Sequence, residues 1–406
     1  MSEQKRRNLV GWLVVLATSA AFGATFVSRF IWTPIMPAAT EAWGLTATQA
    51  GAFVTAFFVG YIITQVPGGA LADKHGSRMV LTVSLLICGA ATLVLGFVDY
   101  QAGLLFRAIS GLGAGTVYAT GLKAIATYFD DKQRSTAMGV FFSSAFLGQM
   151  INNLMAPRVE KALGWQVNFI FAGIIVFLAA AACFFLITKE EQTQAAAKKI
   201  RLVDGLRIIM GSRDLILLCV GSFFYYWVNN AVSVWGFSFL VTGRGLDKEM
   251  AGNVFAFINF TNIIMALLWG VIIDRFKISR RNMLVLSLGA QAVMIALMGI
   301  QALPIVVCIV FIWVKESLNK AVGVSIAPLI VQKAGVEYSG TANAMQNLFN
   351  QFASVLSPMV LGYILDVSGG NYAVTWPVVS VFGLLSCFLY SRVSKDQRRP
   401  VENAAA

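Results

Sequence analysis

Long apolar runs repeat along the whole chain of 406 residues. Each run is long enough for a helix to cross the hydrocarbon core of a bilayer, which takes about 20 residues. Charged residues make up only 12% of the sequence, about half of the fraction that is usual in soluble domains. The pattern predicts an all-α membrane protein with twelve transmembrane helices. The predicted spans are 10–37, 47–71, 79–98, 102–128, 134–157, 166–188, 214–242, 249–273, 282–301, 303–332, 338–365 and 371–393.

A polar stretch with a basic cluster separates the sixth predicted span from the seventh. The two sets of six spans are predicted to form two pseudo-symmetric halves. The predicted parts are an N-terminal half at 1–188, a cytoplasmic central loop at 189–213, a C-terminal half at 214–393 and a cytoplasmic tail at 394–406.

Basic residues favour one side of the predicted bundle, although the net charge of +12 at first suggests a nucleic-acid partner. They flank the apolar spans and form no separate basic domain, so no nucleic acid is expected. Only Arg158, Lys161, Arg244 and Lys248 lie in the connections on the side opposite the N-terminus. Because basic loops stay in the cytoplasm, both termini are expected there, in a monomeric multi-pass protein of the inner cell membrane.

Catalytic and metal-binding signatures are absent from the sequence. The five cysteines fall inside predicted spans without metal-ligand spacing, and the only histidine, His75, lies in a short predicted loop. The sequence has no phosphate-binding loop and no set of serine, histidine and aspartate. We therefore expect neither an enzyme nor a bound cofactor or metal.

The two halves carry similar turns after their second spans. The first turn contains Asp73 and Arg78, and the second contains Asp274 and Arg281. An internal repeat with a binding site between its copies is the plan of many secondary transporters. We interpret these four residues as gating residues, because an acid at such a turn can pair with bases in one conformation and release them in another. Ordinary roles in turns and topology are the alternative.

Three segments resemble known transporter motifs. Gly69-Ala-Leu-Ala-Asp-Lys-His-Gly-Ser-Arg78 resembles the loop motif of the major facilitator superfamily, and Arg107-Ala-Ile-Ser-Gly-Leu-Gly-Ala-Gly115 resembles its fourth-helix motif. The run from Phe58 to Gly69 is similar to the anion:cation symporter branch, which carries organic anions. The resemblance spans essentially the whole chain and implies a twelve-helix fold, alternating access and, often, proton-coupled uptake. Transporters of unrelated substrates share the fourth-helix motif, so Arg107 is interpreted as a gating or helix-packing residue.

The chain also departs from this branch. Its members often carry an acid beside the first-helix arginine and another in the fourth helix, where this sequence has Ser28 and Ala114. Glu316 is the only acid deep inside any predicted span, so it is the candidate for proton coupling. Anion exchange and facilitated transport stay open as alternatives to symport.

Three charges lie near the middle of the predicted span 303–332. A charge at a helix centre costs roughly 2.5–3.5 kcal/mol on insertion scales, so Lys315, Glu316 and Lys320 are expected to face a wet cavity, together with Asn319. Glu316 and Lys320 lie one helical turn apart and can pair, which would leave Lys315 for a ligand. A purely structural group of ion pairs is the alternative.

Arg29, in the first predicted span, offers a planar guanidinium group that suits a carboxylate, phosphate or sulfonate. The family resemblance places a substrate-binding arginine at this position. The alternative is a structural arginine that is paired with backbone carbonyl groups.

Amide and aromatic side chains supply further candidates for the binding site. A polar stripe runs along the predicted span 338–365, and the fifth, seventh and eighth spans add single residues. Polar contacts that hold helices together are the alternative for each of them. These candidates are Tyr226, Asn230, Asn259, Asn347, Asn350 and Gln149.

Together, these residues predict a secondary transporter of small organic anions, with carboxylates favoured. Arg29 from one half and Lys315 or Lys320 from the other would bind the anion, with proton symport or anion exchange as the coupling. One rival is a proton-antiport exporter of drugs or metabolites, but the glycine- and proline-containing motif of exporters is missing from 139–157. The other rival is a membrane sensor, which would normally need an appended soluble domain.

Overall fold

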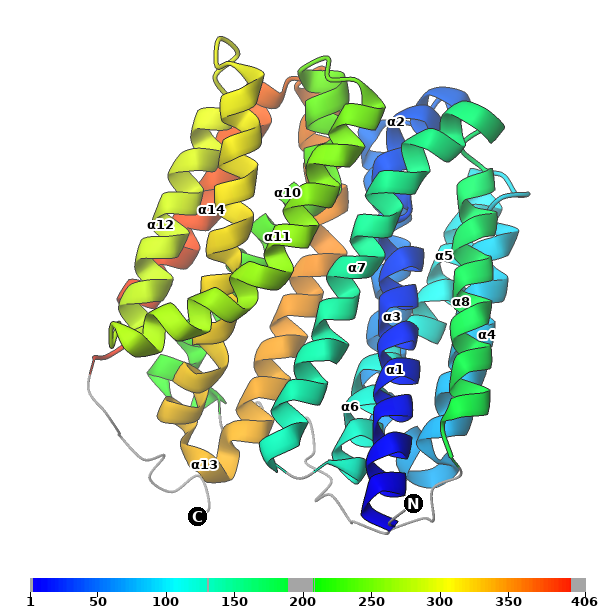
Figure 1. The fold of residues 1–406 in the computed structure, drawn as a ribbon. Helices are drawn as coiled ribbons and strands as arrows, with labels where there is room; N and C mark the ends of the chain where they lie inside the picture. The colour runs from blue at the N-terminus through cyan, green and yellow to red at the C-terminus, as the bar shows by residue number, and fades with distance from the viewer. Residues whose placement is uncertain (1–2, 130, 189–206, 208, 396–406) are drawn as a thin grey trace. The chain divides into compact units, whose positions relative to one another are not determined.

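The structure of the protein is a computed structural model that describes residues 3–129, 131–188, 207 and 209–395 (Figure 1). The predicted central loop at 189–213 and the predicted tail at 394–406 lie largely outside these described residues. Almost all of the described chain is helical. It forms two compact units.

Unit 1 consists of Met1–Ala195 and Gly245–Phe260. Its helices are α1 (Glu3–Phe30), α2 (Trp32–Trp43), α3 (Ala47–His75), α4 (Ser77–Val94), α5 (Tyr100–Gly115), α6 (Val117–Tyr128), α7 (Asp131–Leu163), α8 (Val167–Leu186) and the first part of α11 (Lys248–Arg275). Helix α3 packs on α5 and α4 packs on α8, while α1 contacts α6, α7 and α8.

Unit 2 consists of Ala196–Arg244 and Thr261–Ala406. Its helices are α10 (Arg213–Ser238), the short π-helix η1 (Phe239–Gly243), the rest of α11, α12 (Arg280–Met298), α13 (Ile305–Val367) and α14 (Tyr372–Ser391). Helix α10 packs on α13 and α14, and α12 packs on the same two helices.

The helices agree with the prediction, because each of the twelve predicted spans coincides with one or two helices of the structure. Nine segments of the described chain are long and apolar enough to cross a membrane. The other three predicted spans are interrupted or polar. Residues 102–128 are divided between α5 and α6, residues 134–157 lie in α7 with its amide side chains, and residues 303–332 lie in α13 with its charges.

Helix α13 contains two predicted spans in one continuous element. Its backbone leaves the helical region at Gly335, where φ is 78° and ψ is 162°. A positive φ of this size suits glycine, which has no Cβ to clash with the backbone. The break separates the predicted spans 303–332 and 338–365, so they are joined by a kink rather than by a loop.

Helices α3 and α5 approach so closely that no side chain fits between them. A Cβ at Gly111 would lie 2.0 Å from the carbonyl oxygen of Phe57, and one at Gly60 would lie 1.9 Å from that of Ala108. A Cβ at Gly115 would lie 2.3 Å from the backbone of α3. Gly111 and Gly115 of the fourth-helix motif therefore set the packing of α5 on α3, and their spacing of about one helical turn keeps them on one face, whereas Gly113 faces α4.

Replacing Gly111 with alanine is expected to destabilise the protein by about 1–3 kcal/mol, because the added methyl group forces α5 away from α3. The measurement is thermal unfolding of the purified protein in detergent. Gly139→Ala in α7 is the matched control, since nothing lies within 4 Å of a Cβ there and alanine favours a helix. Equal unfolding temperatures for Gly111→Ala and the wild type would contradict this account of the packing.

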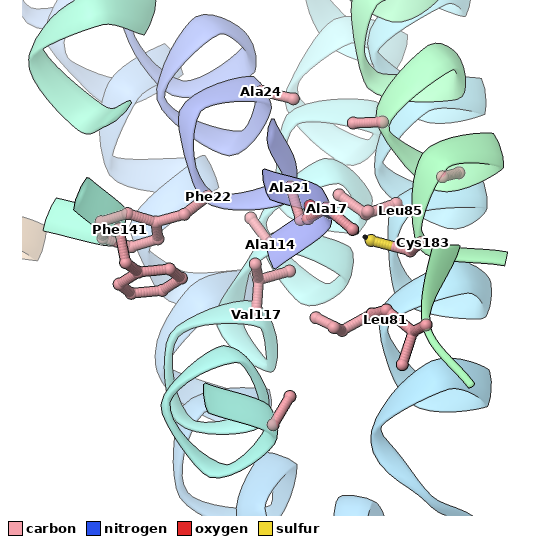
Figure 2. Packing of buried hydrophobic residues seen from close by; sticks show 14 of the residues in the cluster. Ala17, Ala21, Phe22, Ala24, Leu81, Leu85, Ala114, Val117, Phe141 and Cys183 are labelled. Carbon is pink, nitrogen blue, oxygen red and sulfur yellow. Dashed lines mark hydrogen bonds between the residues drawn. The ribbon is translucent and has the colours of Figure 1, made fainter. Parts of the chain in front are cut away.

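The core of unit 1 combines aromatic rings with small side chains (Figure 2). Phe22 of α1 stacks on Phe141 of α7 with 4.4 Å between the ring centroids. Ala17 and Cys183 are fully buried, and the Cys183 thiol donates to the Ala17 carbonyl oxygen at 3.5 Å. Cys183 thus acts as a small core residue, which is what its place inside an apolar span indicates.

Candidate functional site

Arg29, in the last turn of α1, lies among aromatic rings of α1 and α3. Its guanidinium carbon is 4.4 Å from the centroid of the Tyr61 ring, 4.8 Å from that of Phe26 and 5.2 Å from that of Phe58. Two further ring centroids lie within 6.0 Å. The ring faces attract a cation by about 0.5–2 kcal/mol each, depending on how dry the site is. This aromatic cage holds a positive charge without neutralising it.

Within the described part of the chain, the charge of Arg29 is not compensated by an acid. Among the residues that the structure describes, no carboxylate pairs with it, and its buried Nε has no hydrogen-bond partner. The neighbouring Ser28, which stands where the related branch often carries an acid, shares a hydrogen bond of 2.7 Å with the Thr92 hydroxyl. A cation that is largely removed from water and lacks a counterion is a candidate anion site, because pairing would offset part of its desolvation.

Arg107 and Asn152 hold the end of α1 in place. Arg107 is fully buried and donates to the carbonyl oxygens of Ser28 at 2.9 Å and Arg29 at 3.0 Å. The Asn152 amide donates to the carbonyl oxygen of Val27 at 2.9 Å. The Val27 carbonyl also accepts the Ile31 backbone N–H at 3.0 Å, so Asn152 adds a second bond there, whereas Arg107 bonds two carbonyls of the last helical turn. The alternative role considered for Arg29, a structural arginine bonded to backbone carbonyls, is thus filled by Arg107. Helices α5 and α7 together fix the position of Arg29.

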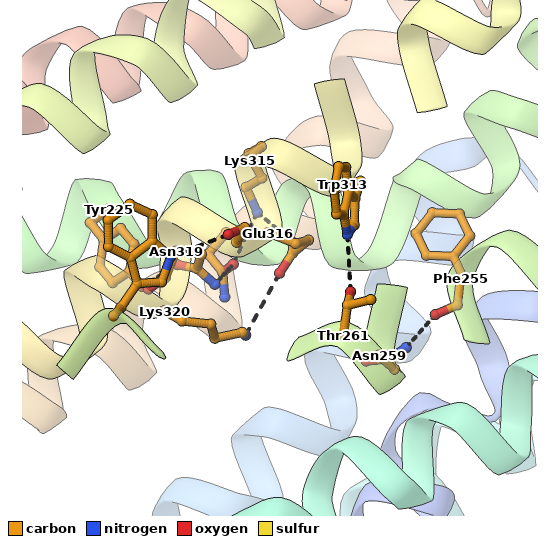
Figure 3. Close-up of polar contacts among 12 residues, drawn as sticks. Tyr225, Phe255, Asn259, Thr261, Trp313, Lys315, Glu316, Asn319 and Lys320 are labelled. Carbon is orange, nitrogen blue, oxygen red and sulfur yellow. Dashed lines mark hydrogen bonds and ion pairs between the residues drawn. The ribbon is translucent and has the colours of Figure 1, made fainter. Parts of the chain in front are cut away.

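A second group of charges lies on α13 in unit 2 (Figure 3). The Lys315 ammonium group is 2.7 Å from the Glu316 carboxylate, and only 1% of the lysine side chain is exposed. Lys320 lies 3.8 Å from the other oxygen of the same carboxylate, and its side chain is 13% exposed. The predicted contact of Glu316 with Lys320 is present, but Lys315 makes the closer pair.

Asn229 of α10 links these charges to a second helix, although it was not among the predicted site residues. Its side-chain oxygen accepts hydrogen bonds from Lys315 at 3.1 Å and from the Asn319 amide at 2.8 Å. Tyr225, one turn earlier on α10, donates to the side-chain oxygen of Asn319. The spacing of four residues places Tyr225 and Asn229 on one face of α10, but this spacing alone does not show that the face meets α13.

The α13 group keeps one net positive charge, because two ammonium groups face one carboxylate. Lys315 is buried and bonded to Glu316 and Asn229, so its charge is committed inside the protein. Lys320 shares the same carboxylate at a longer distance and is the more exposed of the two lysines. An approaching anion would therefore engage Lys320 with less disruption than Lys315.

Four other predicted binding residues lie in unit 2. Asn230 of α10 donates to the Ser354 hydroxyl of α13 at 2.8 Å, so it joins these two helices. The side-chain oxygen of Asn350 is buried and has no hydrogen-bond partner among the described residues. Buried polar atoms are nearly always bonded, so this acceptor is suited to a ligand or a water molecule. Tyr226 and Asn347 are partly buried.

The remaining two predicted binding residues belong to unit 1. Gln149 is partly buried on α7, three residues before Asn152. Asn259 of α11 is buried, and its amide donates to the carbonyl oxygen of Phe255 in the same helix at 2.8 Å (Figure 3). In this structure, Asn259 therefore supports its own helix.

The first predicted gating turn contains an ion pair. Asp73, near the end of α3, lies 2.7 Å from the ammonium group of Lys123 on α6. Lys123 also donates to the carbonyl oxygen of Ala72 at 3.0 Å, so it ties the end of α3 to α6. The guanidinium carbon of Arg78 lies 4.3 Å from the centroid of the Phe184 ring.

The second predicted gating turn pairs its acid with a different base. Asp274 accepts a hydrogen bond from Arg280 at 3.0 Å, at the start of α12. Arg281 instead donates to the carbonyl oxygen of Ser391 in α14. Each turn thus contains an aspartate in an ion pair, but the basic partner lies on α6 for Asp73 and at the start of α12 for Asp274.

Four charged residues pair crosswise between the end of α7 and the start of α11. Lys248 lies 2.5 Å from Glu160, and Lys161 lies 2.7 Å from Glu249. The hydrogen bond to Glu249 and the charge of that carboxylate raise the pKa of Lys161. These pairs account for two of the four basic residues on the predicted outer side. The Lys161 pair is exposed and contributes little to stability, whereas the Lys248–Glu160 pair is partly buried.

The sequence matches the family model of the Major Facilitator Superfamily over residues 18–358 and 218–405. Solved transporter structures have the same fold. The D-xylose-proton symporter gives a TM-score of 0.75 at 14% identity and covers 94% of this chain and 97% of that chain. A bacterial homolog of the human lysosomal transporter Spinster, in an inward-facing and occupied conformation, gives 0.77 at 16% identity, covering 98% and 100%. These matches confirm the predicted fold class.

Several relatives in sequence are transporters of organic acids by name. The Probable sulfoacetate transporter SauU of Cupriavidus necator is 26% identical over 387 residues, which cover 89% of each chain. The Hexuronate transporter of Bacillus subtilis is 25% identical over 351 residues, which cover 80% of this chain and 81% of that protein. The Probable galactarate/D-glucarate transporter GarP of Escherichia coli is 23% identical over 387 residues, which cover 85% and 86%.

Proposed function

Because this chain belongs to the Major Facilitator Superfamily, a family of membrane transporters, we propose that it carries small organic anions by alternating access. The relatives named for sulfoacetate, hexuronate and galactarate or D-glucarate support this substrate class. Their named substrates share a small size and at least one carboxylate, which makes carboxylates the favoured substrates here.

The observation that carries the proposal is the charge of Arg29. Its guanidinium group lies in an aromatic cage and has no carboxylate partner among the described residues. A carboxylate or sulfonate can accept two parallel hydrogen bonds from such a group. Arg29 is partly buried among these rings, and a charge pair is stronger where the dielectric constant is lower than in water. Arg29 is therefore the proposed primary anchor for the anion.

Lys320 is the anion-binding group that we propose in unit 2. Lys315, Asn319 and Asn229 form the bonded frame that keeps the α13 charges in position. One positive charge on Arg29 and one net charge on the α13 group suit a mono- or dicarboxylate. The amide side chains of Gln149, Asn230, Asn259, Asn347 and Asn350, with Tyr226, are proposed to provide neutral contacts to the rest of the substrate.

Glu316 is the proposed coupling residue. Each negative charge that enters against an interior-negative potential costs about 2.3 kcal/mol per 100 mV, so uptake needs a co-transported cation or an exchanged anion. Glu316 lies between two lysines. An anion that engages Lys320 weakens the attraction that keeps the carboxylate charged, and proton uptake then follows anion binding. This order of events would give symport of a proton with the anion.

We place the transporter in the inner cell membrane as a monomer with both termini in the cytoplasm. The uneven distribution of lysine and arginine between the predicted loops supports this orientation. With this topology, the crosswise ion pairs between α7 and α11 would lie on the outer side.

Thermal unfolding of the purified protein with a panel of organic acids, at two pH values, tests the proposed function. We expect small carboxylates or sulfonates to raise the unfolding temperature, with a stabilisation of about 2.7 kcal/mol at a hundredfold excess over Kd. Proton uptake with the anion predicts a larger effect at the lower pH. Matched neutral polyols serve as controls. Stabilisation by organic amines and by none of the acids would reject an anion transporter.

A further inference from the structure

A pocket of about 300 Å³ lies in unit 2. None of its described lining residues belongs to the α13 charge group of Lys315, Glu316 and Lys320. It is formed by the turn before α12, the α13 segment just before the Gly335 kink and the residues that follow α14. Four of its lining residues are cationic, and none of its described lining residues is acidic. The cations are Arg280, Arg281, Lys333 and Lys395.

Two of these four cations form ion pairs with acids that lie outside the pocket lining. Arg280 pairs with Asp274 at 3.0 Å, and Lys333 pairs with Asp214 at 3.0 Å. Neither acid lines the pocket. Within the described chain, no ion pair joins Arg281 or Lys395 to a carboxylate. The pocket wall therefore carries four positive charges against two negative ones, a net charge of two.

The donors of Arg281 are only partly used by the protein. Its guanidinium group donates to the carbonyl oxygen of Ser391. Its Nε is buried and has no hydrogen-bond partner among the described residues. A buried donor without a partner is unfavourable, so a ligand that brought acceptors to this arginine would recover free energy.

Lys395 is held at the pocket by its neighbour in the chain. The carbonyl oxygen and the hydroxyl of Ser394 accept hydrogen bonds from Lys333 at 2.8 and 2.6 Å. The backbone N–H of Ser394 donates to Asp214 at 3.0 Å. These contacts tie the segment after α14 to α10 and α13. Lys395, which is exposed, therefore lines the same pocket as Arg281.

We propose that this pocket binds a phosphate group, carried either by the headgroup of an anionic phospholipid or by a free phosphate ester. An arginine fork and a nearby ammonium group match the charge and the acceptors of phosphate. The volume is at the lower end for small-ligand pockets, which suits a headgroup better than a large cofactor. In the proposed topology the pocket opens on the cytoplasmic side, where anionic lipids gather and basic pockets between helices bind their headgroups.

The test compares two double variants that remove the same charges. Arg281→Gln/Lys395→Gln changes the pocket, whereas Arg275→Gln/Lys277→Gln changes exposed residues of the preceding turn that do not line it. Binding of phosphatidylglycerol to the full chain in detergent is measured by native mass spectrometry, with phosphatidylcholine as the control lipid. We expect the pocket variant to bind phosphatidylglycerol about tenfold more weakly, and the exposed variant to bind it as the wild type does.

Two further experiments identify the source of the phosphate group and show whether weaker binding results from misfolding of a variant. Displacement of the lipid by glycerol 3-phosphate assigns the pocket to free esters, whereas binding of the lipid alone assigns it to headgroups. The single variant Lys395→Gln, at an exposed position, is expected to weaken binding without lowering the unfolding temperature. Equal loss in both double variants, wild-type binding in the pocket variant, or no binding of either probe to the wild type overturns the proposal. None of these results depends on the transported anion, so they are independent of the proposed function.

Discussion

Arg29→Ala is expected to weaken binding of the transported anion by about 2–5 kcal/mol, which is roughly 30-fold or more in Kd. The variant removes the guanidinium group that lies in the aromatic cage without a carboxylate partner among the described residues. Arg29→Lys keeps the charge and loses the planar fork, so we expect an intermediate affinity. Kd is measured by titration calorimetry with the acid that gives the largest thermal stabilisation.

The control for this experiment is Arg392→Ala, which removes an exposed arginine after α14. Its affinity for the anion is expected to match that of the wild type. The unfolding temperature of each variant without ligand shows whether it is folded. A folded Arg29→Ala protein with wild-type affinity would exclude Arg29 as the anion anchor. Equal losses of ligand-free stability in Arg29→Ala and Arg29→Lys would instead indicate a structural arginine.

Glu316→Gln is expected to abolish proton-driven accumulation of the anion and to spare anion exchange. A symported proton cancels the charge of a monoanion, so the pH difference drives its accumulation. One pH unit supports a concentration ratio of about tenfold, and this ratio should fall to one in the variant. The glutamine cannot take up the proton, yet it keeps the size of the side chain. Because Lys315 and Lys320 then lose this carboxylate, we expect anion affinity to be undiminished. Both transport modes are measured in proteoliposomes with a labelled acid.

Glu41→Gln, at an exposed position on α2, is the matched control and is expected to leave both modes intact. Loss of accumulation and exchange to the same extent in Glu316→Gln would reject a coupling role and would point to a structural one. Full accumulation in the variant would show that the proton is carried elsewhere or that another ion drives uptake.

Hydropathy and turn chemistry predicted most of the fold. The predicted boundary between the spans 303–332 and 338–365 coincides with the break of α13 at Gly335, but the continuity of the helix across this boundary was not predicted. The breaks within the first and fourth predicted spans were not predicted. The α1–α2 junction lies at Ile31 and the α5–α6 junction at Thr116. Pro34 cannot donate to the Phe30 carbonyl and Gly115 directly precedes Thr116, so local sequence contributes to both junctions, and Arg107 also bonds the end of α1.

The candidate site was predicted in part. The charges on α13 stood out because they are costly in an apolar span. Their pairing did not follow from helical spacing, since adjacent residues such as Lys315 and Glu316 diverge by about 100° around a helix and meet only because lysine is long and flexible. The role of Asn229 depends on which face of α10 meets α13, and periodicity within one helix cannot give that.

The glycine contact of α3 with α5 has a mechanical consequence. Two backbones that already touch have no side-chain layer that can shear or repack. Arg107 of α5 is hydrogen-bonded to the last turn of α1 and so attaches α1 to the pair formed by α3 and α5. Arg29 thus belongs to a rigid part of unit 1, and an anion bound there as proposed would move together with these helices.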